Sequence, residues 1–324
     1  MSKSLSLLAG TGYAAIFGFS FLVTKGALVV LDPMELIFVR FLLAALLMTI
    51  LAATGIVKIQ YKGKKISILA GMVLFQPVLY FIFETYGVRE SATSTAGIIL
   101  GALPAIVALL GFFFLKESIT KIQSLGLGLS VLGVIIVVAL GAQSQTGAEG
   151  TFRGAMLLIG SMLSAAFFNI FSRKASQIFT DYERTFAMMW SGALAFGIIV
   201  LLRYMLNGGS LPALSVGSQN LVLSSLPARA LRVWFAIFYL GVLSSVIAFF
   251  LINFSLTRLK ASQSAVFTNL ITVITVVAGV VVRGEKFDIV QGIGAAIIIL
   301  GIFLANSRNN EGKGANRAIG TVKI

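Results

Sequence analysis

Three ionisable residues stand inside long apolar runs of the sequence, namely Lys25, Arg40 and Glu84. A charge in hydrocarbon is costly, so charged side chains inside membrane segments usually pair with one another or line the path of an ion or solute. Glu84 is the only acidic residue that falls clearly inside such a run, which makes it the candidate for binding a coupled proton. The chemistry that these residues could perform is binding and movement of charge across a membrane.

The composition argues against covalent or metal-assisted catalysis. The chain contains no Cys and no His, so it lacks thiols and the usual ligands for zinc, copper and haem. It also lacks the phosphate-binding pattern GxxxxGK[ST], which leaves a chemical gradient as the energy source for uphill transport. A membrane enzyme acting on lipid would normally cluster His, Asp or Glu near one face. We therefore predict that the protein is not an enzyme and uses no cofactor.

The elements that position these charges are predicted to be transmembrane helices. Of the 324 residues, 58% are hydrophobic and 11% are charged, against about a quarter charged in soluble domains, and the mean hydropathy is +1.00. Apolar residues run continuously rather than in alternation, which favours helices over barrel strands. We predict an all-α integral membrane protein with ten transmembrane helices at about 5–30, 34–57, 66–87, 92–115, 122–142, 154–172, 185–206, 232–257, 261–283 and 287–305.

Basic residues give the predicted orientation in the membrane. The net charge is +14, and most Lys and Arg in loops fall on one side if the amino terminus is cytoplasmic, as the cluster from Lys58 to Lys65 illustrates. This bias predicts a multi-pass protein of the cytoplasmic membrane with both termini inside. The positive charge would then face lipid headgroups rather than nucleic acid. The polar segment 308–324 is predicted to be a disordered cytoplasmic tail.

An internal repeat divides the chain into two halves. A shift of 168 residues aligns 93–133 with 261–301 without a gap and superimposes Ser94 on Ser262, Gly126 on Gly294, Gly133 on Gly301, Glu117 on Glu285 and Gln123 on Gln291. We predict two five-helix repeats, 1–145 and 150–307. Since five is odd, the second repeat enters the membrane from the opposite side. Inverted repeats are common in secondary transporters, although a passive channel stays open as an alternative.

A binding site is expected between the halves near the middle of the membrane, where unpaired polar groups can surround a cavity. The candidate substrate-binding residues are Ser20, Gln76, Tyr80, Asn169, Trp190, Asn253, Thr268 and Asn269. Hydrogen bonding between helices is the alternative role for the Ser, Thr, Asn and Gln residues, and a position in the interfacial aromatic belt is the alternative for Trp190.

Two groups of charges are candidates for gating or coupling. Counting about 1.5 Å per helical residue places Lys25, Arg40 and Glu84 near the outer end of their helices, where they could form one cluster. Alternatively, Glu84 reaches the headgroups or pairs with Arg89. The segment 168–176 is similar to 19–27, which places Arg173 and Lys174 at the inner end of the sixth helix as a counterpart. Ordinary anchoring by the positive-inside rule is the alternative for both.

Several short motifs resemble the EamA family of the drug/metabolite transporter superfamily over about 10–305. They are FGFSF at 17–21 with Lys25, Pro33 and Arg40, SATSTAGIILGALP at 91–104, LKE ending at Glu117, Gly126, RGE ending at Glu285, and QGIG at 291–294. Thr272, where the family's fourth-helix proline would recur, and Glu84 depart from the pattern.

The resemblance implies a permease of two five-helix units that exports amino acids or similar small metabolites. Membrane lipids are expected as partners, and a proton gradient acting through Glu84 is the expected energy source, with uncoupled facilitated exit as the alternative. Movement of lipid or lipid-linked cargo, by a transporter or flippase, is the alternative, and the protein could act as a monomer or a homodimer.

Overall fold

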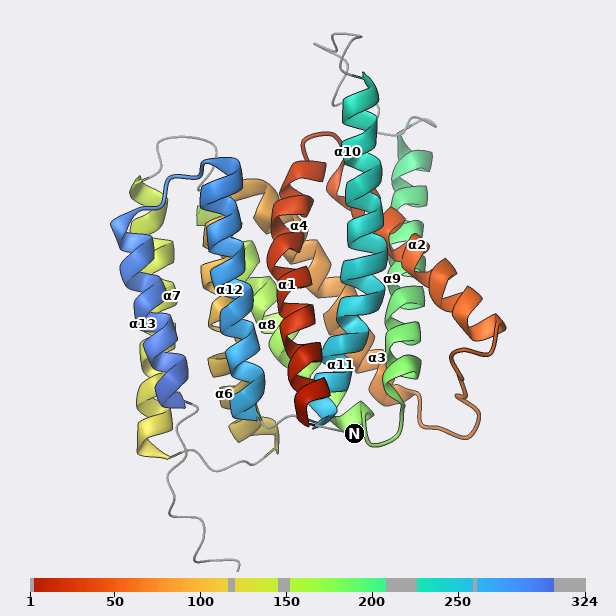
Figure 1. Cartoon of the computed structure of the whole chain (residues 1–324), viewed down its shortest axis with the longest axis horizontal. Helices are drawn as coiled ribbons and strands as arrows, with labels where there is room; N and C mark the ends of the chain where they lie inside the picture. The colour runs from red at the N-terminus through yellow and green to blue at the C-terminus, as the bar shows by residue number, and fades with distance from the viewer. Residues whose placement is uncertain (1–2, 116–119, 145–151, 208–225, 259–260, 306–324) are drawn as a thin grey trace, which may run out of the picture.

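The computed structural model describes residues 3–115, 120–144, 152–207, 226–258 and 261–305, and this part of the chain is almost entirely helical (Figure 1). In the first predicted half the elements are α1 (Lys3–Ala27), α2 (Pro33–Ala53), α3 (Ser67–Val73), η1 (Leu74–Leu79), α4 (Tyr80–Glu90), α5 (Thr93–Gly101), α6 (Leu103–Leu115) and α7 (Lys121–Ser144). In the second they are α8 (Phe152–Ala175), α9 (Asp181–Leu206), α10 (Leu226–Phe238), η4 (Tyr239–Ile247), α11 (Ala248–Arg258), α12 (Ala261–Arg283) and α13 (Ile289–Ala305). The predicted tail at 308–324 lies outside the described residues.

The length and composition of these helices suit a lipid bilayer. Within the described residues, eight helical spans are long and apolar enough to cross a membrane, and two shorter apolar helices cover Phe267–Arg283 and Ile289–Ala305. Large apolar side chains are strongly exposed on the outside, including Leu206 at 84%, Val281 at 75% and Phe303 at 72%. Such exposure would be unfavourable in water, whereas lipid tails solvate it. The chain is a multi-pass membrane protein.

Two of the apolar runs are interrupted where the sequence carries proline. At Gln76 the backbone is extended, with φ −149° and ψ 116°, and Pro77 follows inside the π-helical segment η1. Proline has no N–H to donate and its ring crowds the preceding turn, so it favours an interruption of the helical hydrogen bonds at this point. The run predicted at 92–115 is likewise divided into α5 and α6, just before Pro104. The third run of the second half also contains a π-helical segment, η4.

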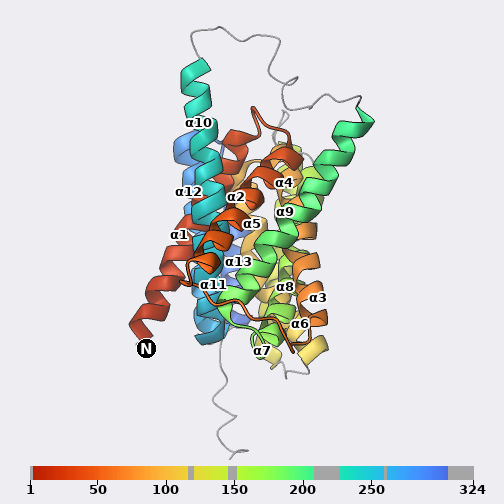
Figure 2. The same cartoon turned by 90° about the vertical axis from the view of Figure 1, so that its right-hand side faces the viewer.

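Two helix pairs that join the predicted halves lie at opposite ends of the molecule. In Figure 1, α7 and α13 run side by side at the left edge, while α2 and α9 lie toward the right. The other helices fill the space between them. Figure 2, turned by 90°, shows α2 crossing α9 on the face toward the viewer. The middle of the molecule is therefore enclosed by helices from both halves.

Two ion pairs connect α9 to the first predicted half, one at the start of α2 and one in the loop between α2 and α3. Asp32 caps α2 by accepting a hydrogen bond from the backbone N–H of Met34, and Arg203 of α9 donates to the same carboxylate at 2.7 Å. At the other end of α9, Glu183 in its first turn accepts two hydrogen bonds from Lys64, at 2.6 and 2.8 Å. Glu183 is only 2% exposed but the Lys64 side chain is 26% exposed, so the pair lies at the edge of the buried region, and its two short hydrogen bonds fix its geometry.

α7 and α13 pack closely because glycines line both sides of their contact. A Cβ atom added at Gly301 would collide with the backbone of Gly126, and one added at Gly133 would collide with the backbone of Gly294. Small residues let the backbones of membrane helices approach, which increases the van der Waals contact between them. Ser130 adds a hydrogen bond of 3.5 Å to the carbonyl of Ile298. The glycine pattern is therefore a packing feature.

Candidate functional site

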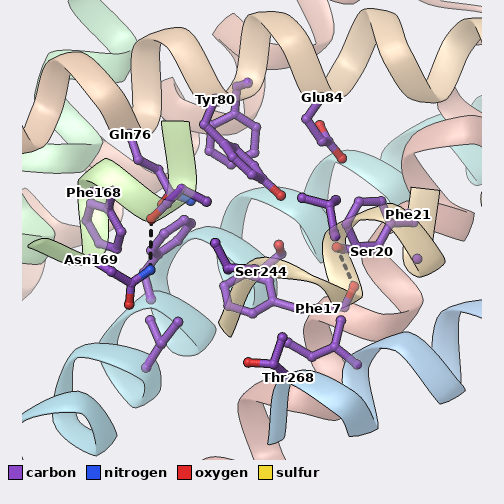
Figure 3. Close-up of a pocket in the computed structure, with 18 of the residues that line it drawn as sticks. Phe17, Ser20, Phe21, Gln76, Tyr80, Glu84, Phe168, Asn169, Ser244 and Thr268 are labelled. Carbon is purple, nitrogen blue, oxygen red and sulfur yellow. Dashed lines mark hydrogen bonds between the residues drawn. The ribbon is translucent and has the colours of Figure 1, made fainter. Parts of the chain in front are cut away.

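A cavity of about 90 Å³ lies between the two predicted halves (Figure 3). Its volume is below the roughly 300–1,000 Å³ of pockets for drug-sized ligands, which favours a small solute. The polar and charged residues that line it are Ser20, Arg40, Gln76, Tyr80, Glu84, Asn169, Ser244, Thr268 and Thr272. The aromatic residues that line it are Phe17, Phe21, Phe81, Phe168 and Phe249, together with Tyr80.

Three of the polar residues form a stripe along one helical segment. Gln76, Tyr80 and Glu84 are spaced four residues apart, so η1 and α4 present them on one face. Figure 3 shows all three projecting from the same segment toward the cavity. The extended backbone at Gln76 lies at the start of this stripe. No protein hydrogen bond of the Gln76 amide or the Tyr80 hydroxyl occurs among the described residues, so both groups are available to a ligand.

Glu84 carries the negative charge of the cavity. Its side chain is 3% exposed, and one carboxylate oxygen accepts a hydrogen bond from the Thr85 hydroxyl at 3.0 Å. In the part of the chain that the structure describes, no Lys or Arg nitrogen reaches ion-pair distance of this carboxylate. A buried carboxylate usually has several hydrogen-bond partners, so Glu84 retains acceptor capacity toward the cavity.

Arg40 carries the positive charge. Its Nε donates to the Ser245 hydroxyl and its Nη2 donates to the Ser244 hydroxyl, each at 3.1 Å. The guanidinium also lies over the Phe81 ring, with 4.4 Å from Cζ to the ring centroid. These contacts tie α2 to η4 of the other predicted half and hold the guanidinium at the cavity wall.

The remaining polar groups hydrogen bond mainly within their own helices. Ser20 donates to the carbonyl of Phe17 at 2.7 Å, and the Asn169 amide donates to the carbonyl of Ala165 at 2.8 Å, as the dashed lines in Figure 3 mark. Bonds to the preceding turn leave the second hydrogen-bonding side of each group free for another partner. Thr268 lines the same cavity from α12.

Three of the predicted substrate-binding residues do not line this cavity. Trp190 donates from Nε1 to the Thr49 hydroxyl at 3.0 Å, in the contact between α9 and α2. Asn253 is fully buried and donates to the Thr185 hydroxyl at 3.1 Å. Asn269 is half-buried, and its Oδ1 has no hydrogen-bond partner among the described residues. Asn253 joins α11 to α9, which is the alternative role predicted for an Asn, whereas Trp190 joins α9 to α2, a contact that neither of its predicted roles describes.

The predicted gating residues fall into three environments. Arg40 and Glu84 line the cavity together. Lys25 is 8% exposed and donates to the carbonyl of Ser91 at 2.5 Å, outside the cavity lining. At the end of α8, Arg173 is half-buried and Lys174 is exposed. The structure therefore brings two of the five charges into one site.

Sequence reasoning missed several residues of interest. The lining phenylalanines carry no signal of their own, because the chain contains 26 Phe residues in runs that are apolar throughout. Ser244 is identified as a site residue only in the structure, where its hydroxyl accepts a hydrogen bond from Arg40. Arg184 reads as a loop cation by the positive-inside rule, yet it is 1% exposed and donates to Asp181 at 2.5 Å and to the Ser172 hydroxyl at 2.7 Å. Its Nη1 also donates to Oδ1 of Asn253 at 3.2 Å.

One carboxylate outside the membrane-spanning segments joins the two predicted halves. Glu285, between α12 and α13, accepts hydrogen bonds of 2.8 Å from the backbone N–H groups of Thr93 and Ser94 at the start of α5. Burial raises the pKa of Glu285, but these hydrogen bonds to its charged form outweigh burial and lower the pKa below 4.5. Its repeat counterpart, Glu117, lies outside the described residues. Among the residues that the structure places, no group of three or more His, Cys, Asp or Glu could hold a metal ion.

Comparison with known proteins gives a consistent result. The EamA-like transporter family matches residues 4–139 and 152–307. An uncharacterized transporter of Bacillus subtilis, YcxC, is 32% identical over 299 residues, covering 92% of each chain. A probable amino-acid metabolite efflux pump of Salmonella typhimurium is 23% identical, covering 89% of this chain and 90% of that protein.

Two further comparisons are more distant. A probable terminal-alkyne amino-acid exporter of Streptantibioticus cattleyicolor is 20% identical and covers 71% of this chain and 69% of its own. A crystal structure of another protein has a TM-score of 0.62 at 17% identity and covers 94% of this chain and 98% of that one, which shows a shared fold.

Proposed function

Because this chain belongs to the EamA-like transporter family, we propose that it is a secondary transporter that moves small metabolites outward across the cytoplasmic membrane by alternating access. Amino acids or related compounds are the best candidates for the cargo, since some relatives are named as exporters of such compounds. The observation that carries the proposal is the central cavity, where polar and charged groups from both predicted halves meet.

The helix contacts support an architecture of ten transmembrane helices in two inverted repeats. The sequence alignment makes Gly126 equivalent to Gly294 and Gly133 equivalent to Gly301. In space, Gly126 lies against Gly301 and Gly133 lies against Gly294, so the contact is unchanged when the halves are exchanged. A twofold axis produces this reciprocal pattern. The pairing also runs antiparallel along α7 and α13, as inversion in the membrane requires.

Alternating access needs one closure on each side of the cavity, and two sets of contacts are suited to this. Lys25 joins the end of α1 to the carbonyl of Ser91, before α5, on the side that the charge distribution assigns to the exterior. Arg184 and Asn253 join α9 to α11 near the opposite side. In this proposal Lys25, Arg40 and Glu84 serve the outer gate, and Arg173 and Lys174 lie at the inner end.

Proton coupling is proposed at Glu84. It is the only acidic residue among those that line the cavity. The groups that interact with it are the Arg40 guanidinium on α2, the Tyr80 hydroxyl and the Thr85 hydroxyl, which donates a hydrogen bond to it. A carboxylate that faces the cargo can exchange a proton for cargo as the cavity changes sides, which would couple export to proton entry.

Transport by purified protein in liposomes tests the proposal. Vesicles are loaded with a pooled mixture of amino acids and related metabolites, and loss of each compound is followed with and without an imposed pH gradient. Selective and saturable loss of one compound class supports a metabolite transporter. Absence of movement for all pooled solutes, with protein shown to be folded, would contradict it.

One observation favours the second candidate, a transporter of lipid or lipid-linked cargo. A wholly apolar groove runs between α1 and α12 and is lined by Phe19, Val273, Ile274, Val277, Ala278, Val281 and Val282. An acyl chain could lie in such a groove. If no soluble compound moves in the pooled assay, a lipid-flipping assay in the same vesicles is the next measurement.

A further inference from the structure

We propose that Arg40 and Glu84 bind the two charges of one zwitterionic amino acid, with the guanidinium holding the α-carboxylate and the Glu84 carboxylate holding the α-ammonium group. This inference rests on the proposed transport function and specifies its cargo. It differs from the gating role because it places both side chains in direct contact with the substrate.

The first argument is the placement of the charges. Arg40 on α2 and Glu84 on α4 line the same cavity, and each is 3% exposed. Each charge lies in the electric field of the other, yet they form no direct ion pair in the described part of the chain. A positive and a negative group that face one cavity without joining each other leave room for a ligand between them.

The second argument is the hydrogen-bonding capacity that remains. A guanidinium has about five N–H donors, and the hydroxyls of Ser244 and Ser245 accept two of them. The remaining donors of Arg40 have no acceptor among the described residues. The Glu84 carboxylate accepts only from the Thr85 hydroxyl. Both groups can therefore make charge-assisted hydrogen bonds to a ligand, which are the stronger kind.

The third argument is charge balance. An isolated charge in a desolvated site is costly, and removing one partner of a buried pair leaves the other uncompensated. An anionic solute bound by Arg40 would leave Glu84 without a countercharge, and a cationic solute bound by Glu84 would leave Arg40 without one. A zwitterion satisfies both at once, so the cavity discriminates by charge distribution rather than by net charge.

The aromatic lining extends the argument to the cargo's side chain. Phe17, Phe21, Phe168 and Phe249 surround the cavity away from any further charge. Burial of apolar surface against these rings, in a cavity of about 90 Å³, favours an amino acid with a small apolar side chain. A second charge on the cargo would find no partner among the lining residues.

The first test uses three probes on the wild-type protein in liposomes. They are L-alanine, propionate, which lacks the ammonium group, and ethylamine, which lacks the carboxylate. Each is measured as a competitor of radiolabelled L-alanine counterflow. Since a charge-assisted hydrogen bond contributes about 1.5–3 kcal/mol, each analogue should compete at least about tenfold more weakly than L-alanine. Equal competition by either analogue would overturn the inference.

The second test measures how substitution of Arg40 or Glu84 changes the preference of the protein between the two analogues. With Arg40→Gln, ethylamine should gain on propionate as a competitor by about tenfold or more relative to wild type, because Glu84 then acts alone. With Glu84→Gln, the ratio should shift by a similar factor in the opposite direction. A purely structural role for Arg40, holding α2 to η4, would lower the amount of folded protein without shifting this ratio.

Two controls keep the outcomes separate. Arg153→Gln also removes an arginine, but one whose side chain is 78% exposed and outside the cavity lining, so it should leave the order of the three probes unchanged. If Arg40→Gln does not fold, Arg40→Lys, which keeps the positive charge, is measured in its place. Transport of another pooled solute without discrimination among the three probes would refute the zwitterion site while the transport function stands. Absence of transport for every solute would refute the proposed function itself.

Discussion

At the scale of single residues, the sequence identified the charges but not their partners. Glu84 and Arg40 stand out because charge is rare in apolar runs, and both line the cavity. Step-counting predicted one cluster of Lys25, Arg40 and Glu84 from their shared depth, but depth alone could not show that Lys25 lies outside the cavity lining and bonds to Ser91 instead. Residue type alone did not give the role of Trp190 or Asn253. Both types occur in binding sites, but in the structure each side chain hydrogen bonds to another helix.

Glu84 provides the test of proton coupling. In Glu84→Gln vesicles, an imposed pH gradient should no longer accelerate export, because the amide cannot take up and release a proton. Glu90→Gln is the matched control, since Glu90 ends the same helix outside the cavity lining, and its coupling should equal that of wild type. The measurement is initial efflux rate with and without the gradient. Retained acceleration in Glu84→Gln would place coupling elsewhere.

Tyr80 tests the polar stripe. Tyr80→Phe removes only a hydroxyl that faces the cavity, so apparent affinity for the cargo should fall about 2- to 10-fold, in line with roughly 0.5–1.5 kcal/mol for a neutral hydrogen bond. Tyr13→Phe is the control, because Tyr13 is 2% exposed and packs edge-on against Phe267 outside the cavity. Concentration dependence of transport distinguishes the two variants. Equal behaviour would exclude the Tyr80 hydroxyl from binding.

At the scale of helices, the apolar runs predicted the elements well because continuous hydrophobicity is a strong signal. The breaks within runs were harder: Pro77 and Pro104 mark them, but many membrane helices continue through proline with only a bend. The repeat alignment made Gly126 equivalent to Gly294, yet it could not say that Gly126 packs against Gly301, because equivalence and contact are different relations.

The glycine contact should be intolerant of added volume. Gly301→Ala places a Cβ against the backbone of Gly126, and backbone cannot shift as a flexible side chain can. The expected loss of stability is about 1–3 kcal/mol, seen as a lower thermal unfolding midpoint in detergent. Gly128→Ala is the control, because a Cβ there meets nothing within 4 Å. Equal midpoints for both variants would show that α7 and α13 are not held at this distance.

The connection from Glu285 to α5 should make stability depend on pH. Hydrogen bonds from Thr93 and Ser94 lower the pKa of Glu285 below its ordinary 4.5, so the unfolded state takes up its proton first. The stabilisation is complete above that ordinary value and is lost as pH falls through the lower folded pKa. As the pH is lowered from neutral to about 3, the thermal unfolding midpoint of wild type should therefore decrease more steeply than that of Glu285→Gln. Parallel curves would contradict this.

At the scale of the whole molecule, the sequence predicted a membrane protein and its two related halves more securely than its cavity. Composition and repeats extend over hundreds of residues, so chance cannot readily imitate them. The cavity depends on how Ser20, Asn169 and Thr268 from three separate helices face one another, which only packing decides.

The predicted orientation can be tested by labelling, since the chain has no Cys and single cysteines can be introduced without background. Lys62→Cys, in the exposed loop after α2, should react with a membrane-impermeant maleimide only after the cells are opened. Arg153→Cys, at a position where the arginine side chain is 78% exposed, should react in intact cells. The reverse pattern would invert the topology and with it the assignment of the outer gate.

Two ion pairs connect α9 to the first predicted half and restrict how such a molecule can move. Arg203 pairs with Asp32 at the start of α2, Glu183 pairs with Lys64 in the loop between α2 and α3, and glycines bring α7 and α13 together at the far edge. If access alternates as proposed, we expect the predicted halves to rotate about an axis through these two contacts rather than to separate. Spin labels on α2 and α9 should then keep a constant spacing between the two states and give an internal reference for other displacements.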